Sequence, residues 1–555
     1  MSHPSRPLLY RARSERLEKV PSGAEAPVPK FGLWARVNSC PALLLKKDAI
    51  EWGAIDCVGY RPNARGIQEG KMRRSLNGLV ASFFVLAFVF GTVESATAAL
   101  RAGAARVDIT PRANPSNPPN GRYEHERLYL RAIVLENGSA RAALIGADQS
   151  GLSEEVWAVA SKQIATELDC PVANVLMSAT HTHSGMAPGD LPGRGGFGQP
   201  QPGDPPPPIV AQLLQVVREA KSKLQPARVG FGTGFSYLNV NRDAIDAQTH
   251  LWTQAPNLDA PSDKTVAVLK FETPEGKPIA AYIDYAMHPV NGWLAGFISA
   301  DFPGATSRYV EQAYGDNMVA IFVQGASGDQ NPLYLRAGTN VMASRGGAPI
   351  TGNVMTREKI EAPLRDNKVE AKAADPKVRD QLEEVMKSEG VLLGEEVIRI
   401  MTDTLRMDSN PSVTAEQKII HCPGRRRLDD GREGRPGKYE DADPVAIRLG
   451  VFRIGDIALA SVDAEIYSVI GMRLKKESPL ANTVVVTLAN GRANSGYIPN
   501  DTAYGAYTFQ VLGSRLKAGY AESAMVDGWL DLIAKTHGHL SAQTSGEASV
   551  RVSGD

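Results

Sequence analysis

The chain has 555 residues, a length typical of two to four domains, and its 43% hydrophobic and 22% charged residues are ordinary for a soluble globular protein. Basic and acidic residues balance at 61 each, but 14 of the basic and 8 of the acidic ones lie in residues 1–98, which leaves 47 and 53 in the remainder. A mildly acidic body argues against a nucleic-acid-binding groove, so no nucleic-acid partner is expected.

The N-terminal region has the pattern of a secretory signal peptide over residues 72–98. Met72-Arg73-Arg74 begins a positive segment, an apolar run follows at 79–90, and Ala96-Thr97-Ala98 is a small-x-small cleavage pattern. The alternative is a membrane anchor, but the run is shorter than the roughly 20 residues of a spanning helix. Because a signal peptide begins a chain, we expect translation to start at Met72, residues 1–71 to be an upstream extension, and the product to be exported to the periplasm or the extracellular space.

Cysteine usage limits the kinds of metal site available. Only Cys170 and Cys422 follow the signal segment. Two cysteines do not form a disulfide framework, and export does not force them to pair. Since no cysteine cluster offers a zinc site, a bound metal would need histidine and oxygen ligands.

A strand–helix–strand pattern over residues 141–180 indicates an α/β protein. The strand at 141–147 is followed by Ser153, a favourable N-cap for a helix that we expect to end near residue 168. An apolar run at 175–177 then leads into Ser178-Ala179-Thr180-His181-Thr182-His183-Ser184-Gly185. In a strand, the two histidines would point to the same side and could reach one site. Taken alone, such a pair is as often solvated or structural.

The remaining elements follow in chain order. Further helices are expected at 209–224, from a cap at Asp301, at 377–407 and at 521–536. Further strands are expected at 265–271, 279–286, 319–323, 457–462 and 483–488. By composition, residues 187–208 are a loop, 334–370 an irregular insertion, 421–443 a charged glycine-rich loop and 541–555 a flexible tail.

Several polar residues follow directly on apolar strands. They are His181, His183, His288, Asp329, Glu465 and Tyr497. In α/β sheets, ligand sites gather at the carboxyl ends of the strands, so these side chains are expected to meet. Each has a structural alternative, because Glu465 could serve a helix dipole, Tyr497 could be a rim aromatic and His288 could be a buried histidine. Their joint arrival at one edge nevertheless predicts a metal site.

Four segments in order resemble one known family. SATHTHSG, YAMHPVNG, VDAEIY and NGRANSGYIPN are similar to motifs of the neutral/alkaline (non-lysosomal) ceramidases, over about residues 103–540. These enzymes are zinc-dependent amidases that cleave the N-acyl bond of ceramide. The resemblance implies a single α/β catalytic domain with mixed sheets over residues 99–540, a metal site at the strand carboxyl ends, and no C-terminal immunoglobulin-like domain of the kind that the family carries.

The resemblance also implies roles for individual residues. The Zn²⁺ ligands would be His181, His288, Glu465 and Tyr497. His183 would be the adjacent site histidine, suited by its usual pKa to carry a proton to the leaving group. Arg242 matches a family arginine near the scissile amide and would stabilise the developing oxyanion, although it could also be an ordinary surface arginine.

One departure from the family pattern concerns its essential serine. The family has G-[DN]-x-S-P-N where this chain has Gly328-Asp329-Gln330-Asn331-Pro332-Leu333, so Asn331 takes the place of the serine and Ser327 lies four residues too early. This argues against a serine nucleophile and favours metal-assisted hydrolysis, with Asp329 and Asn331 orienting water or substrate. Asp148 could be a hydrogen-bond partner of a ligand histidine.

The expected substrate is a small-molecule or lipid acyl compound, whose pocket the loop at 187–208 would rim, and a peripheral membrane contact is compatible with it. The first interpretation is hydrolysis of an N-acyl amide. One alternative keeps the metal but cleaves an ester, lactone or phosphoester. The other is an inactive secreted binding protein on the same fold. The sequence gives no indication of the oligomeric state.

Overall fold

The computed structural model describes most of the chain beyond the N-terminal region. The described residues are 99–110, 127–185, 208–292, 298–335, 376–403, 405–429 and 433–550, with side chains described up to Thr536. They lie within one compact unit. The expected upstream extension, the signal peptide and nearly all of the 187–208 loop and the 334–370 insertion lie outside the described residues.

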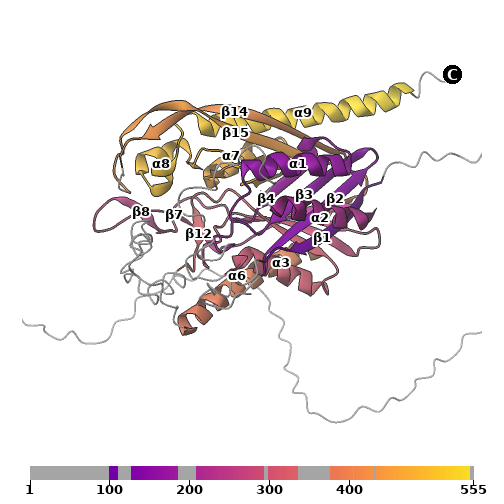
Figure 1. Ribbon diagram of the computed structural model, residues 1–555, viewed down its shortest axis with the longest axis horizontal. Helices are drawn as coiled ribbons and strands as arrows, with labels where there is room; N and C mark the ends of the chain where they lie inside the picture. Colours follow the sequence, from indigo (N-terminus) through magenta and orange to yellow (C-terminus); the bar gives the residue numbers. More distant parts are fainter. Residues whose placement is uncertain are drawn as a thin grey trace, which may run out of the picture. The chain divides into compact units, whose positions relative to one another are not determined.

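The first sheet, sheet A, has the strand order β4-β3-β2-β1-β5. Its strands are β1 (Arg101–Asp108), β2 (Tyr129–Asn137), β3 (Ala140–Ala147), β4 (Val175–Ala179) and β5 (Gln225–Pro226). Only β3 and β4 are parallel, and α1 (Glu154–Leu168) connects them. Ser153 caps α1 as expected, since its hydroxyl accepts from Val156 N at 3.3 Å. The helices α1 and α2 (Pro208–Ser222) cover one face of this sheet, as Figure 1 shows.

The second sheet, sheet B, has the order β11-β10-β9-β6-β13. Its strands are β6 (Arg228–Phe235), β9 (Thr265–Glu272), β10 (Pro278–Tyr285), β11 (Val319–Gln324) and β13 (Met407–Asp408). The helices α3 (Asp301–Ala313) and α6 (Pro376–Thr402) pack on its outer face. A small antiparallel sheet lies alongside, formed by β12 (Gln330–Pro332), β7 (Asn239–Ile245) and β8 (Trp252–Asn257).

The third large sheet, sheet D, has the order β14-β15-β16-β18. Its strands are β14 (Val413–Arg427), β15 (Tyr439–Ile454), β16 (Ile457–Val462) and β18 (Asn482–Val486). The expectation of a loop at 421–443 is wrong, because residues 422–427 pair with 439–445 in the long hairpin that Figure 1 draws in orange. The helices α7 (Ser468–Glu477) and α9 (Ala521–Val550) cover this sheet. The last helix therefore continues past its expected end at 536 and through most of the segment that was expected to form the tail.

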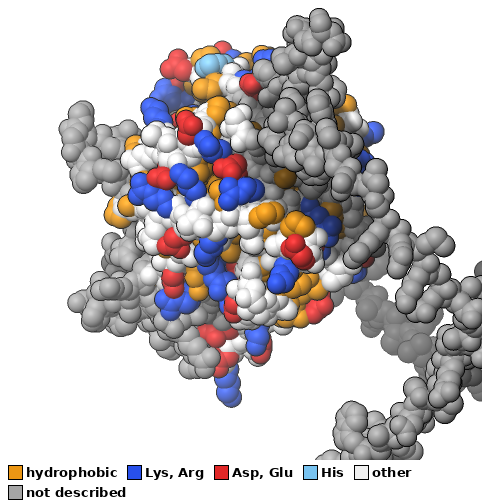
Figure 2. Space-filling view, turned by 90° about the vertical axis from the view of Figure 1, so that its right-hand side faces the viewer, with side chains coloured by type: hydrophobic (Ala, Val, Ile, Leu, Met, Phe, Trp, Pro, Cys, Tyr) orange, Lys and Arg blue, Asp and Glu red, His pale blue; other side chains and the backbone are white. Residues whose placement is uncertain are grey.

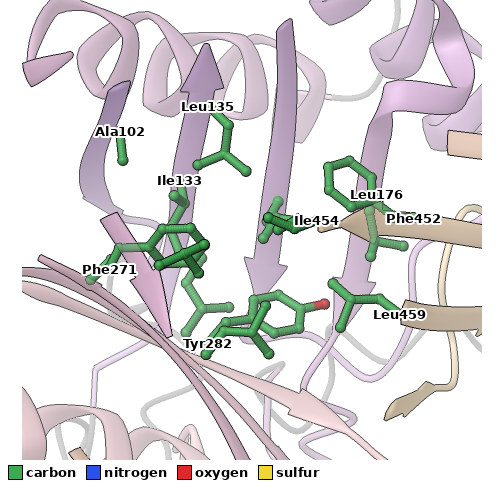
Figure 3. Close-up of a cluster of buried hydrophobic side chains, with 14 of the residues drawn as sticks. Ala102, Ile133, Leu135, Leu176, Phe271, Tyr282, Phe452, Ile454 and Leu459 are labelled. Atoms are coloured by element: carbon green, nitrogen blue, oxygen red, sulfur yellow. The ribbon is translucent and has the colours of Figure 1, made fainter. Parts of the chain in front are cut away.

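The main core lies where the inner faces of the three sheets meet. Figure 3 shows it, with side chains from all three sheets pointing toward one another: Ile133, Leu135 and Leu176 from sheet A, Phe271 and Tyr282 from sheet B, and Phe452, Ile454 and Leu459 from sheet D. Full burial of each large apolar side chain stabilises the fold by about 1.5–3 kcal/mol. The described architecture is thus helices, sheet A, sheets B and D, and helices again, which confirms the mixed α/β class.

This layering places several loops at one edge. The pairs β3–β4, β10–β11 and β16–β18 are parallel, so the carboxyl ends of both strands in each pair share an edge. Two backbone hydrogen bonds join these edges across sheets, from Thr487 N to Gln324 O at 2.8 Å and from Ala179 N to Leu488 O at 3.3 Å. The residues that follow the strands therefore converge from three sheets.

Two further observations concern the distribution of surface charge and the length of the apolar helices. On the face shown in Figure 2, basic and acidic side chains are interspersed among the described residues, and they form no continuous basic area there. Among the described helices, none combines the length and apolar composition needed to cross a bilayer.

Candidate metal centre

His181 lies two residues beyond β4 and has a left-handed backbone conformation, with a φ of 67°. Non-glycine residues rarely adopt it, and such strain concentrates at functional sites. The backbone amide of His181 donates to Gln149 O at 2.9 Å, and its Nδ1 lies 2.6 Å from Ser150 O. Because a carbonyl only accepts, Nδ1 carries the proton of the neutral ring and Nε2 keeps its lone pair. This turn, and not the expected strand alternation, sets the direction of the ring.

His288 follows β10 and is fixed in the same tautomer. Its Nδ1 donates to Ser327 O at 2.8 Å and lies 3.1 Å from Gln330 O, so Nε2 again keeps its lone pair. Burial, together with the positive charge of Arg242, lowers the pKa of His288 to about 3. The ring is therefore neutral over the physiological range and available as a ligand.

The ring nitrogens and one carboxylate converge on a common point. The Nε2 atom of His181 lies 3.2 Å from Nε2 of His288 and 3.2 Å from Nε2 of His183. Glu465 Oε2 is 3.2 Å from His181 Nε2 and 3.3 Å from His288 Nε2. With the protons of His181 and His288 on Nδ1, no hydrogen is available between these lone pairs, and they repel one another. A cation at the point of convergence would remove that repulsion.

Glu465 supplies the negative charge of the cluster. Its Oε2 is buried and has no hydrogen-bond partner among the described residues, a costly state for a carboxylate. Two or three imidazoles with one carboxylate are a ligand set typical of zinc, and the three histidine nitrogens lie within 4.8 Å of one another. The residues present therefore fit a metal ion.

Tyr497 enters the site through a two-stranded parallel sheet. This sheet pairs β17 (Glu465–Ile466) with β19 (Tyr497–Ile498), which places Tyr497 beside Glu465. The Tyr497 hydroxyl lies 3.5 Å from His288 Nε2, farther out than the other candidate ligands. Burial and the charge of Glu465 raise the pKa of Tyr497, so without a cation it is a neutral phenol.

Arg492 was missed by the sequence reasoning. Its Nη2 lies 3.6 Å from Glu465 Oε1, on the side of the carboxylate away from the histidines. The residue lies inside the NGRANSGY motif that carried the family resemblance, which was the only signal in the sequence.

Arg242 is a buried residue of β7 and not the surface arginine that was its alternative. Its Nη1 donates to Asn331 Oδ1 at 3.1 Å and its Nη2 to Gly328 O at 2.5 Å. The guanidinium lies over the rings of Tyr497 and Phe509, 5.4 and 5.0 Å from their centroids. Its Nε is buried and has no hydrogen-bond partner among the described residues. Asn331, at the position of the family serine, thus holds this cation in place.

Asp329 is occupied by contacts within the protein. Its carboxylate accepts from Ser468 N at 2.7 Å, from Ser468 Oγ at 3.0 Å and from Asn241 Nδ2 at 2.9 Å. These bonds tie the start of α7 and strand β7 to the turn that also holds His288. Burial raises the pKa of Asp329 to about 6. Its contacts are those of a positioning residue.

Main-chain carbonyls orient the candidate ligand histidines His181 and His288, and Asp148 is not among their hydrogen-bond partners in the described part of the chain. Asp148 instead forms an ion pair with Arg131 at 2.9 Å and accepts from Tyr129 N at 2.8 Å. The expectation that it would partner a ligand histidine is therefore wrong. Ser327, the serine nearest to the family position, contributes its carbonyl to His288, while its hydroxyl accepts from Gln324 Nε2 at 2.6 Å.

Comparison with known proteins identifies proteins that are similar to this chain. The family described as neutral/alkaline non-lysosomal ceramidase, N-terminal, matches residues 113–346. Neutral ceramidase B of Dictyostelium discoideum is 27% identical over 253 residues, which are 41% of this chain and 33% of that protein. The match thus spans about a third of the length of this curated relative.

Solved structures share the fold. A structure described as "Ceramidase complexed with C2" superposes with a TM-score of 0.56 at 16% identity, covering 80% of this chain and 76% of that one. The neutral ceramidase from Pseudomonas aeruginosa gives a TM-score of 0.52 at 17% identity, covering 79% and 74%. At these identities the likeness concerns the fold alone. Together with the family match over residues 113–346, it confirms the resemblance indicated by the sequence motifs: this chain is similar to the neutral/alkaline non-lysosomal ceramidases over part of its length.

Proposed function

We propose that this chain is a zinc-dependent hydrolase that cleaves an N-acyl amide of the ceramide type. The observation that carries the proposal is the convergence of imidazole Nε2 atoms on the unpartnered Oε2 of Glu465. The family match supports the hydrolase class, and the relative from Dictyostelium discoideum is named as a neutral ceramidase.

The residues that would hold the metal are His181, His288 and Glu465, with Tyr497 as the outermost ligand. When bound, zinc supplies a Lewis acid and a water made acidic enough to react near neutral pH. The chain contributes the orientation, because the carbonyls of Ser150 and Ser327 fix both imidazoles with Nε2 inward. His183 has its Nε2 3.2 Å from His181 Nε2, so it lies within reach of the same reaction.

Two residues would handle charge and protons. Arg242 would stabilise the oxyanion through its unpaired Nε, since it is already held at Asn331 and Gly328 and needs no reorganisation. Burial lowers the pKa of His183 well below its usual value, which keeps the ring neutral before attack but makes it a weak base. His183 would accept a proton during attack and pass it to the leaving amine. A carboxylic ester of the same shape is the nearest competing substrate, because Asn331 replaces the family serine.

Export is proposed from the signal-peptide pattern at residues 72–98, which lie outside the described residues. The expected result of cell fractionation is a mature protein outside the cytoplasm whose N-terminus lies near residue 99. A full-length protein retained in the cytoplasm would contradict this part of the proposal.

The test of the metal site is the zinc content of purified protein. We expect about one zinc per chain in the wild type and none in His181→Ala. The matched control is His421→Ala, which removes an exposed histidine of β14 and should keep the metal. Amide and ester substrates with the same acyl chain are then compared on the zinc-containing protein. Absence of zinc from the wild type, or zinc retained in His181→Ala, would refute the proposed site.

A further inference from the structure

A basic cavity lies directly beside the metal centre. Its volume is about 840 Å³, within the range usual for small-molecule sites. It is bounded by the β14–β15 hairpin, the turn at 492–494 and the segment at 512–515. Six arginines line it: Arg425, Arg426, Arg427, Arg448, Arg492 and Arg515. The acidic lining residues are Glu154, Asp443 and Asp463. The lining therefore has an excess of positive charge, although the chain as a whole has none.

Four of these arginines have carboxylate partners: Arg492 lies 3.6 Å from Glu465, and the other three form closer ion pairs. The pairs are Arg426 with Glu440, Arg427 with Asp429, and Arg448 with Glu154. Arg427 pairs with Asp429 through its Nε, whereas its Nη2 is buried and has no hydrogen-bond partner among the described residues.

Arg425 is partly buried without a carboxylate partner in the described part of the chain. Its Nε donates to Ser514 O at 3.2 Å and its Nη2 to Val511 O at 2.5 Å, and its guanidinium lies 4.0 Å from the ring centroid of Tyr439. These contacts fix the position of the cation but do not neutralise it. Burial correspondingly lowers the pKa of Arg425. A partly buried, immobilised and uncompensated guanidinium is a built recognition element for an anion.

Arg515 and Arg492 extend this element from Arg425 toward the metal centre. The backbone N of Arg425 donates to Arg515 O at 2.8 Å, so these two residues are neighbours on facing segments. Arg515 is exposed and has no carboxylate partner among the described residues. Arg492 lines the cavity and has its Nη2 3.6 Å from Glu465 Oε1, so a ligand held in the cavity lies one side chain away from the candidate metal ligands.

We propose that this cavity binds an anionic group of the substrate, so that the preferred acyl substrates carry a phosphate, sulfate or carboxylate. The inference rests on the proposed hydrolase function and gives its substrate class. Arginine matches these groups with paired N–H donors, whereas a hydrocarbon chain in the same place would desolvate several guanidinium groups without compensation. A neutral head group would leave the charges of Arg425 and Arg515 unpaired.

Direct binding is tested first, on metal-free full-length protein, so that the probe cannot coordinate zinc. The probe is inorganic phosphate, measured by titration calorimetry at low ionic strength. We expect one site in the wild type, about tenfold weaker binding in Arg515→Gln and a larger loss in the double variant Arg492→Gln/Arg515→Gln, because charge-assisted hydrogen bonds are removed. The matched control, Arg218→Gln, removes an exposed cation paired with Glu167 and should bind as the wild type does. No binding by the wild type, or equal binding by all four proteins, overturns the proposal.

The second arm asks whether the anion belongs to the substrate. The zinc-containing protein is assayed with N-butanoylethanolamine and its O-phosphate, which share one amide bond and differ in one charged group. We expect kcat/KM to favour the phosphate by about tenfold or more, and the preference to collapse in Arg515→Gln but not in Arg218→Gln. Phosphate binding without such a preference would show that the cavity takes a free anion, which overturns the substrate assignment. Phosphate binding with no hydrolysis of either compound would refute the proposed function while the anion site stands.

Discussion

The replacement Arg242→Lys separates the role of the guanidinium from that of its charge. The native side chain makes hydrogen bonds of 3.1 Å to Asn331 and 2.5 Å to Gly328 and stacks over two aromatic rings. Lysine keeps the charge but cannot make both bonds and still direct a donor at the substrate. Loss of one oxyanion donor costs about 3–4 kcal/mol in the transition state, so we expect kcat to fall by about 10²–10³ with a small change in KM.

The assay combines steady-state kinetics with zinc content and thermal unfolding. The variant should keep its zinc, because Arg242 is not among the candidate ligands, and should lose about 1.5–3 kcal/mol of unfolding free energy with the impaired hydrogen bonds. Arg218→Lys, on the exposed face of α2, is the control for a generic arginine-to-lysine change. A kcat within a few-fold of the wild type would refute the oxyanion role, and loss of zinc would show that Arg242 acts through the metal site.

Three further predictions concern stability. Burial raises the pKa of Glu433 from 4.5 to about 7, so its carboxyl disfavours the fold increasingly as pH rises through this window. Between pH 5 and 8, the free energy of unfolding of the wild type should therefore fall by about 1–2 kcal/mol relative to that of Glu433→Gln, measured by urea unfolding; this value allows for the partial exposure of the side chain. The same dependence of stability on pH in both proteins would contradict the prediction. Trp529→Ala should lower the free energy of unfolding by about 3–5 kcal/mol in the same assay, because the ring is fully buried under sheet D and its Nε1 donates to Ser461 O at 2.9 Å. A loss below about 1 kcal/mol would show that the contact between α9 and sheet D is dispensable. Chelation of the metal should lower the melting temperature but leave far-ultraviolet circular dichroism unchanged, since the three sheets form the scaffold without it; unfolding on chelation would disprove that independence.

The sequence predicted the convergence of the site because it depends on topology. A polar residue after an apolar strand lies at a sheet edge whatever its side-chain conformation, and His181, His288 and Glu465 all obeyed that rule. The positive φ of His181 has no such signature, since histidine is only enriched in the left-handed region and most histidines have ordinary backbone angles. His181 and His183 therefore lie close together because of this turn, and not because of the expected strand alternation.

The long β14–β15 hairpin was predicted as a loop for a physical reason. Its outer half is charged and glycine-rich, which by local composition favours a loop. The strands form because the inner half packs on α9, with Leu449 and Trp529 in one cluster, and because Arg425 is held between backbone carbonyls and the Tyr439 ring. The arginine-lined cavity depends on this hairpin, so it could not be inferred before the pairing was known.

The candidate ligands are drawn from segments far apart in the chain: 107 residues separate His181 from His288, and 209 separate His288 from Tyr497. Closing loops of this length costs entropy that only sheet assembly repays, so no partial stretch of the chain presents a preformed binding geometry. For the metal site proposed above, uptake would consequently be a late event that follows the docking of the sheets. The compartment in which folding finishes, and not the one in which the chain is synthesised, would then select the ion that binds. Production in a different compartment can therefore change the identity of the bound metal without any change in sequence.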